Sequence, residues 1–123
     1  MSDAEFTARC RRTIDAYMDA FNRRDMAALA AVLDERASLV DWDVSATGRD
    51  AMIAATDKIV SGAKLHITVR HVLIDRPHAV ADLSILINDQ VELEVLDLFE
   101  FAPDGRILSV RAFKGPEKPV SGS

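Results

Sequence analysis

Apolar residues recur every three or four positions in three segments of the first half of the chain, the spacing of helices that pack one face against a core. The segment from Asp3 to Arg23 carries such a stripe opposite Arg, Asp and Asn side chains and predicts a long amphipathic helix. Asp25 is placed to cap a second, alanine-rich helix. Thr47, with Asp50 three residues later, resembles the capping arrangement of a third. The predicted helices span residues 3–23, about 26–33 and about 47–60.

Alternation of apolar and polar residues marks most of the remaining chain and predicts strands. Turn signals at 76–77 (RP), 88–89 (ND) and 103–105 (PDG) separate them. The predicted strands are 37–44, 65–75, 78–88, 91–101 and 106–114. Two prolines and few apolar side chains follow, so we expect one domain over residues 1–115 and a flexible tail over 116–123.

This order of elements predicts an α+β domain in which three N-terminal helices pack on one face of a strongly curved antiparallel sheet. A helix pair cannot cover so strongly bent a sheet completely. We expect the uncovered part to form a conical pocket, open at one end, of the apolar kind that binds small molecules.

Composition and charge narrow the range of functions. The 123 residues are 49 % hydrophobic and 28 % charged, as in ordinary globular domains. A formal charge of −5, with basic residues scattered apart from a short cluster at 9–12, argues against a nucleic-acid or anionic-membrane partner. No segment is apolar enough to cross a bilayer and the N-terminus lacks the apolar centre of a signal peptide, so we expect a cytoplasmic protein.

Cysteine and histidine usage argues against a metal site. Cys10 is the single cysteine, which excludes an intrachain disulfide and a cysteine-based metal site. The three histidines lack the spacing of metal ligands. His71 lies on the apolar side of its predicted strand, where we favour a hydrogen-bonded or rim histidine over an alternative acid or base.

A carboxylate interrupts the apolar side of the predicted strand at 91–101. The odd-numbered residues of this strand share one face, where Asp97 lies among Val, Leu and Phe side chains. Removing an ionised carboxylate from water is costly, so a buried Asp97 must be protonated or have a partner. A bond to a backbone amide or to an arginine such as Arg111 is the structural interpretation, and a catalytic role is the other.

Three segments resemble the nuclear transport factor 2-like superfamily, which includes the SnoaL-type polyketide cyclases, and are most similar to its ketosteroid isomerases. They are AYMDAFNRRDM, ASLVD and VLDLFEFAPDGRILSVRAFKG, within a match from about Thr13 to Gly115. Those isomerases use a tyrosine on the first helix, an aspartate ending the first strand and an aspartate on the penultimate strand. The resemblance therefore implies catalytic roles for Tyr17, Asp41 and Asp97.

The reaction that the resemblance implies is proton transfer beside a carbonyl group, with no metal or organic cofactor. Asp41 would remove a proton from the carbon between a ketone and an alkene. Tyr17 and protonated Asp97 would form an oxyanion hole that donates hydrogen bonds to the enolate oxygen. The implied ligand is a small hydrophobic molecule with a carbonyl group. We also expect a homodimer through the outer sheet face that buries Leu96 and Leu98.

Each of these residues also has a purely structural interpretation, and Asp41 could be an exposed strand-end residue or a turn former. Tyr17 lies on the buried stripe of its helix, as an ordinary core tyrosine would. Asp43 shares the parity of Asp41 and competes with it as the base. Because this scaffold hosts many activities, a SnoaL-type cyclase, dehydratase or hydrolase and a noncatalytic small-molecule-binding domain stay open as alternatives.

The sequence departs from the isomerases around the expected pocket. Leu33, Ala55 and Thr56 stand where those enzymes have aromatic residues that support the catalytic tyrosine or shape the steroid site. Trp42 replaces a proline after the base, and Lys114 replaces an aromatic residue near the mouth, where its ammonium could attract an acidic ligand group. The predicted substrate-binding residues are Phe21, Ala55, Val95, Phe99, Val110, Ala112 and Lys114.

Overall fold

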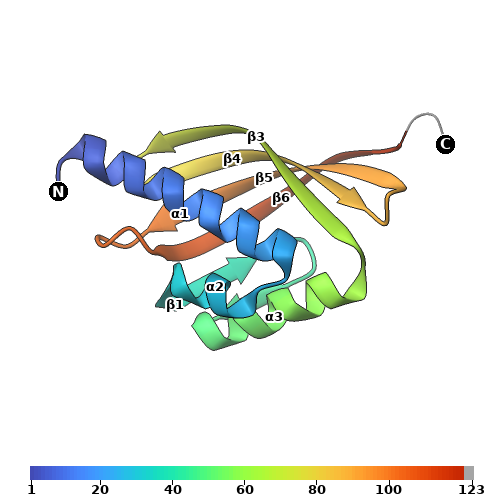
Figure 1. Ribbon diagram of the computed structural model, residues 1–123, viewed down its shortest axis with the longest axis horizontal. Coiled ribbons are helices and arrows are strands. Elements are labelled where there is room, and N and C mark those ends of the chain that lie inside the picture. Colours follow the sequence, from blue (N-terminus) through green and yellow to red (C-terminus); the bar gives the residue numbers. More distant parts are fainter. Residues whose placement is uncertain (121–123) are drawn as a thin grey trace.

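The structure is a computed structural model that describes residues 1–120, and it places three helices against a single six-stranded sheet (Figure 1). The helices are α1 (Asp3–Arg23), α2 (Met26–Ala31) and α3 (Arg49–Gly62). The strands are β1 (Leu33–Val40), β2 (Ser45–Thr47), β3 (Leu65–Asp75), β4 (His78–Ile87), β5 (Val91–Phe101) and β6 (Ile107–Pro119). The predicted α+β class is confirmed. No helix within residues 1–120 is long and apolar enough to cross a membrane.

Local sequence signals set the ends of the first two helices. The Ser2 hydroxyl accepts a hydrogen bond from the backbone N–H of Glu5, whose carboxylate accepts one from the Ser2 backbone. Arg24 ends α1 in the left-handed conformation. Asp25 caps α2 as predicted, because its carboxylate accepts a hydrogen bond from the N–H of Ala28 at 3.0 Å. The two helices thus form a short hairpin.

The predicted side-chain cap of α3 is wrong. Thr47 is the last residue of β2, where it pairs with Ser38 of β1, so the strand pairing removes it from the helix start. Gly48 precedes the helix with φ 94°, and no side chain caps it. Glycine suits this position because a positive φ is strained for other residues.

The sheet order is β2-β1-β6-β5-β4-β3, and β1 runs parallel to β6. The predicted wholly antiparallel sheet is therefore wrong at this pair, and the sheet is mixed. The two strands are not joined by a hairpin, since α3 and three long strands separate them in sequence. β1 also ends at Val40 rather than at residue 44, because the chain turns back there to form β2. Asp41 consequently follows the last residue of β1 directly.

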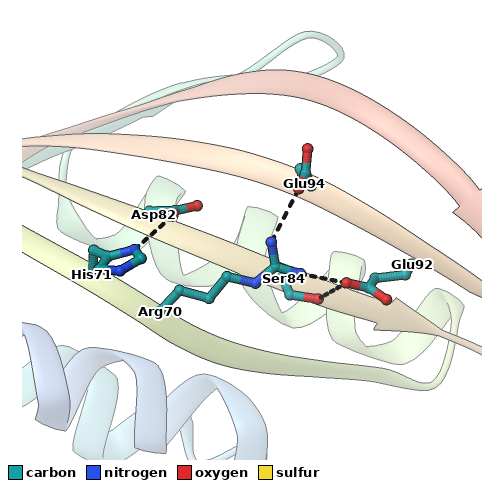
Figure 2. A network of polar contacts seen from close by, with 6 residues as sticks. All are labelled: Arg70, His71, Asp82, Ser84, Glu92 and Glu94. Atoms are coloured by element: carbon teal, nitrogen blue, oxygen red, sulfur yellow. Dashed lines mark hydrogen bonds and ion pairs between the residues drawn. The ribbon is translucent and has the colours of Figure 1, made fainter.

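A bulge in β3 reverses the expected orientation of its second half. The register against β4 shifts between Val69 and His71, which changes the parity of the inward positions. Leu73, expected on the apolar side, is 72 % exposed. The predicted position of His71 on the apolar side is also wrong. Its ring lies on the exposed outer face, with Nδ1 3.0 Å from the Asp82 carboxylate (Figure 2).

Charged side chains link β3, β4 and β5 on this outer face. The Arg70 guanidinium donates hydrogen bonds to Glu92 and Glu94, and the Ser84 hydroxyl donates one to Glu92 (Figure 2). The glutamates on the even positions of β5 are thus paired across the strands. These ion pairs lie away from the apolar inner face.

β6 extends beyond its predicted end at residue 114. Its last residue, Pro119, lies opposite Val91 at the start of β5, and the N–H of Val120 donates to the carbonyl of Gln90 at 2.9 Å. Residues 116–119, which were expected to belong to the tail, are therefore part of β6. Its prolines are tolerated because β1 accompanies β6 only as far as Arg111, which leaves β6 an unpaired edge beyond that point. The rest of the predicted tail, 121–123, lies outside the described residues.

Candidate active site

An apolar cavity of about 140 Å³ lies between the inner sheet face and the helices α1 and α3. Most of its wall is aliphatic, and the three catalytic candidates from the sequence face the same space. The lining residues are Tyr17, Phe21, Leu39, Asp41, Trp42, Thr56, Ile59, Leu65, Ile67, Leu83, Ile85, Ile87, Leu93, Val95, Asp97, Val110 and Ala112.

Asp97 projects from the middle of β5 into this apolar surface, as the parity of the strand predicts. It is 6 % exposed, and no side chain in residues 1–120 hydrogen-bonds to its carboxyl, whose oxygens still reach the cavity. The alternative pairing with Arg111 is not formed, since that guanidinium lies 5.5 Å from the ring centroid of Phe113 instead. Burial raises the pKa of Asp97 to about 7, and the negative charge of Asp41 adds to the rise. At neutral pH a large fraction of Asp97 is therefore protonated.

Tyr17 reaches the cavity from the buried stripe of α1 and is 4 % exposed. Its ring packs edge to face against Phe99. Its hydroxyl has no hydrogen-bond partner among the described side chains and backbone, but it is not sealed from the cavity. Burial, together with the negative charges of Asp97 and Asp41, raises the pKa of Tyr17 well above its ordinary value. The hydroxyl is therefore a hydrogen-bond donor at any physiological pH.

Asp41 lines the cavity at the end of β1, where a turn fixes its carboxylate. Oδ1 accepts hydrogen bonds from the backbone N–H groups of Asp43 at 2.7 Å and Val44 at 2.6 Å. The backbone N–H of Asp41 in turn donates to the carbonyl of Val44 at 2.9 Å. A carboxylate held in this way is anchored at one oxygen, and Oδ2 is the atom left to act on a ligand.

The strand register brings the two carboxyls into one row. Leu39 lies opposite Val110 and Val40 lies opposite Arg111. The same register places Asp41 beside Ala112. Ala112 is itself opposite Asp97. Two strand spacings put the Cα atoms of the two aspartates about 10 Å apart. Only the methyl group of Ala112 occupies the floor between them. A base and a proton donor can therefore act from two sides on a molecule that lies over Ala112.

The predicted substrate-binding residues divide into two groups. Those that line the cavity are Phe21, Val95, Val110 and Ala112. Phe99 does not line it, and its fully buried ring packs edge to face against Tyr17. Ala55 does not line it either, because α3 presents Thr56 and Ile59 to the cavity instead.

Lys114 lies outside the cavity, contrary to the prediction. Its exposed ammonium is 6.0 Å from the ring centroid of Trp42, which forms part of the cavity wall. It makes no ion pair with Asp41 or Asp43. Asp43 is exposed and does not line the cavity, so of the two competing bases only Asp41 faces a ligand space.

Much of the aliphatic wall comes from β3 and β4 and was not predicted as a binding surface. Its members from β4 are Leu83, Ile85 and Ile87, which share one parity of the strand, so this alternation was the available signal. Thr56 is also new, but its hydroxyl donates to the carbonyl of Met52 at 2.9 Å and is satisfied within α3. The lining side chains that carry a hydrogen-bond donor for a ligand are therefore Tyr17, protonated Asp97 and Trp42, through its indole N–H.

Other reactive groups lie elsewhere. No cluster of three or more His, Cys, Asp or Glu side chains that could hold a metal occurs in residues 1–120. Cys10 is fully buried, and burial raises the pKa of its thiol. The chemistry that the described side chains offer at the cavity is proton transfer.

Comparison with known proteins assigns the chain to a family. Residues 14–110 match the SnoaL-like domain. No functionally curated protein shows detectable sequence similarity. Among solved structures, SalBIII, an epoxide hydrolase/cyclase-like enzyme of pyran ring formation in the polyether salinomycin, superposes with a TM-score of 0.81 at 21 % identity, over 98 % of this chain and 100 % of that one.

Two further structures share the fold. A protein of Kribbella flavida DSM 17836 that is provisionally a ketosteroid isomerase superposes with a TM-score of 0.79 at 22 % identity, covering 89 % of this chain and 79 % of that chain. An LEH-like epoxide hydrolase of M. tuberculosis superposes with a TM-score of 0.75 at 16 % identity, covering 88 % and 84 %. These identities establish the shared fold and leave the activity open. The chain belongs to the SnoaL-like domain family, within the nuclear transport factor 2-like fold.

Proposed function

We propose that this protein is a cytoplasmic, cofactor-free isomerase that moves a double bond in a small hydrophobic unsaturated ketone. The observation that carries the proposal is the arrangement of Tyr17, Asp41 and Asp97 around one apolar cavity, with both carboxyls in a single row. In this cavity an enolate oxygen can accept hydrogen bonds from the Tyr17 hydroxyl and from protonated Asp97. A carboxylate faces the same space.

The reaction requires two proton transfers and no redox partner. Oδ2 of Asp41 takes the proton from the carbon between the ketone and the alkene, and the C–H electron pair forms the dienolate. Tyr17 and protonated Asp97 donate hydrogen bonds to the enolate oxygen as its charge develops. Asp41 then returns the proton to the far carbon of the alkene. The product is the conjugated ketone.

The different surroundings of the two carboxyls suit these opposite tasks. Asp97 is buried among apolar side chains, and its pKa of about 7 keeps a proton available for donation. Asp41 is half-buried and its Oδ1 accepts hydrogen bonds from two backbone N–H groups, which leaves Oδ2 towards the cavity. The proposed donor thus lies in apolar surroundings, and the proposed base lies in a polar turn.

Ultraviolet absorbance tests the proposal directly, because conversion of an unconjugated enone to the conjugated ketone produces a strong band. We expect turnover above the buffer rate in the native protein. Asp41→Asn should lower kcat by about 10²- to 10⁴-fold, the usual contribution of a general base. Asn keeps an oxygen for the two N–H groups of the turn, so the fold should persist. Asp43→Asn is the matched control and should retain activity.

A second candidate is acid- and base-assisted opening of an epoxide, by water or by a hydroxyl of the same molecule. The anchoring of Asp41 Oδ1 favours it, since a fixed oxygen suits activation of one O–H group better than carrying a proton between two carbons. Asp97 would give its proton to the epoxide oxygen as the C–O bond breaks, while Asp41 takes the proton of the attacking O–H. Two of the structural neighbours are described as epoxide-opening enzymes.

Mass spectrometry separates the candidates. Incubation of an epoxide in ¹⁸O-labelled water should add one labelled oxygen if the protein is a hydrolase, and should give an unlabelled cyclic ether from an epoxy alcohol if it is a cyclase. Asp97→Asn should slow either reaction. If neither enones nor epoxides react while phenols still bind, the noncatalytic ligand-binding function is left.

We also propose a homodimer through the outer sheet face. Leu96 is 48 % exposed and Phe113, its neighbour in β6, is 49 % exposed, beside the half-buried Leu98. Burial of such a patch in a second copy removes apolar area from water. Light scattering at micromolar concentration should give twice the monomer mass, and Leu96→Glu should reduce it to one monomer. A native monomer would contradict the proposed dimer.

A further inference from the structure

The size of the side chains on the cavity floor changes along the strands. In the row of the two carboxyls the side chains opposite Asp97 are small: Ala112, which lines the cavity, on one side and the fully buried Ala81 on the other. The next two rows of β4 and β5 carry larger aliphatic side chains, Val95 opposite Leu83 and Leu93 opposite Ile85. The space for reacting atoms therefore lies over Ala112, and a hydrocarbon track leads away from it.

This track runs towards solvent at one end. Leu83, Val95 and Leu93 are buried, whereas Ile87 and Leu65 at the far end are half-exposed. Four residues separate Asp97 from Leu93, a rise of about 13 Å along an extended strand. The cavity is therefore longer along the strands than the width of a single ring.

The volume sets a limit on what can lie on this floor. The cavity holds about 140 Å³, and an apolar engineered cavity of about 150 Å³ in another protein takes up benzene. This volume is about what one six-membered ring needs, but it extends along the strands, so a longer ligand must pass the half-exposed rim at Leu65 and Ile87. A rigid set of fused rings would have to displace the aliphatic walls, whereas a flexible chain can continue along the track to the rim.

We propose that the substrate has a single ring or an acyclic unsaturated head that lies over Ala112, with an unbranched hydrocarbon tail along β4 and β5 towards Leu65 and Ile87. Fused polycyclic ketones should bind more weakly, because their rigid rings would have to displace the aliphatic walls. The inference rests on the proposed function for the identity of the reacting carbonyl group. The size and shape of the ligand follow from the cavity itself.

Binding of phenols tests the shape independently of turnover, because a phenol oxygen can occupy the place of the enolate oxygen. The probes are phenol, 4-ethylphenol, 4-butylphenol, 4-hexylphenol and the fused four-ring phenol equilenin, measured by calorimetry. We expect affinity to rise about fourfold per methylene over the first carbons and to level off when the chain reaches the rim. Equilenin should bind more weakly than 4-butylphenol. Equal or tighter binding of equilenin, or a flat alkyl series, would overturn the inference.

Two substitutions locate the track. Ile85→Phe should make the alkyl series level off at a shorter chain, while Leu86→Phe, on the next residue and the opposite sheet face, should leave it unchanged. Ala112→Val should weaken all the phenols alike, by tenfold or more, because it fills the floor below the ring. Thermal unfolding followed by circular dichroism confirms that each variant folds. If a variant does not fold, the alkylphenol affinities of the native protein decide whether the inference holds.

Failure of the inference and failure of the proposed function give different results. If enones are isomerised but steroid-sized enones react as well as monocyclic ones, the shape inference fails and the function stands. If the alkyl series behaves as expected but no enone reacts, the track stands and the chemistry is different.

Discussion

The ring of Tyr17 meets the ring of Phe99 edge to face, with centroids 5.6 Å apart and planes inclined by 87°. Phe99 also stacks on Phe101 at 6.0 Å. The orientation of the Tyr17 hydroxyl in the cavity is thus supported by an aromatic side chain that has no contact with the ligand space. Substitution of Phe99 should therefore alter the orientation of the Tyr17 hydroxyl in the cavity.

We expect Phe99→Leu to lower the free energy of unfolding by about 1–2 kcal/mol through loss of aromatic contact and packing. It should also weaken phenol binding severalfold, since Tyr17 loses its support. Phe101→Leu is the matched control, because it removes a stacking partner that does not touch Tyr17. Urea unfolding and calorimetric titration measure the two effects. Equal phenol affinities in both variants would contradict the positioning role of Phe99.

The stability of the protein should depend on pH through Asp97. Its pKa is about 7 in the folded state against an ordinary value of 3.8. Between these values the folded protein holds a proton that the unfolded chain has released, so stability falls as pH rises, by at most about 1.4 kcal/mol per pH unit. Above about pH 7 this contribution is constant. Asp97→Asn should therefore gain stability relative to the native protein between pH 4 and pH 7.

Urea unfolding at half-unit pH steps checks this expectation. Asp57→Asn provides the control, because Asp57 is exposed on α3 and forms no ion pair among the described residues. A stability difference between the native protein and Asp97→Asn that does not change with pH would show that Asp97 is ionised throughout.

The same proton should govern activity. The rate of enone isomerisation is expected to fall as pH rises through about 7, because Asp97 loses the proton that it donates to the enolate oxygen. An asparagine donates without titrating, so the profile of Asp97→Asn should be flatter on the alkaline side. Steady-state kcat between pH 5 and pH 9 measures both. Identical alkaline limbs in the two proteins would assign the ionisation to another group.

A polar side chain joins α1 to the wall of the cavity. The Asn22 amide donates to the carbonyl of Ile67 at 2.9 Å and its oxygen accepts from the Ile67 N–H at 2.7 Å. Asn22→Ala leaves both backbone groups without these partners, so the free energy of unfolding should fall by about 1–3 kcal/mol. Alkylphenol binding should weaken too, because Ile67 lines the cavity. Asp19→Ala, which removes only an exposed ion pair to Arg23, should change stability by less than about 0.5 kcal/mol.

The sequence predicts well those structural features that depend only on residues close together in the chain. The parity of β5 suffices to place Asp97 on the apolar face, because alternation within one strand needs no knowledge of its partners. The stripe of α1 likewise suffices to bury Tyr17. Both residues reach the same cavity. Local periodicity thus accounts for their burial, whereas the catalytic roles expected of Tyr17, Asp41 and Asp97 are what the family resemblance implies.

What the sequence misses depends on pairing between distant segments. The bulge that turns His71 outward exists only in the register of β3 against β4. The parallel pairing of β1 with β6, which aligns Asp41 with Ala112, joins parts of the chain separated by more than half its length. The fit of α3 against the sheet decides that Thr56 rather than Ala55 faces the cavity. None of these follows from the spacing of apolar residues.

Because β6 lies between β1 and β5, the site can form only after β6 has docked between them. Before Ala112 docks, Asp41 and Asp97 are not held in one row. The strand that lies between them, β6, follows both residues in the sequence. Closing so long a loop in parallel register is slow compared with forming local contacts. A chain without β6 would therefore contain Tyr17, Asp41 and Asp97 but would not align the two carboxyls, so the ability to bind a ligand depends on this long-range docking step.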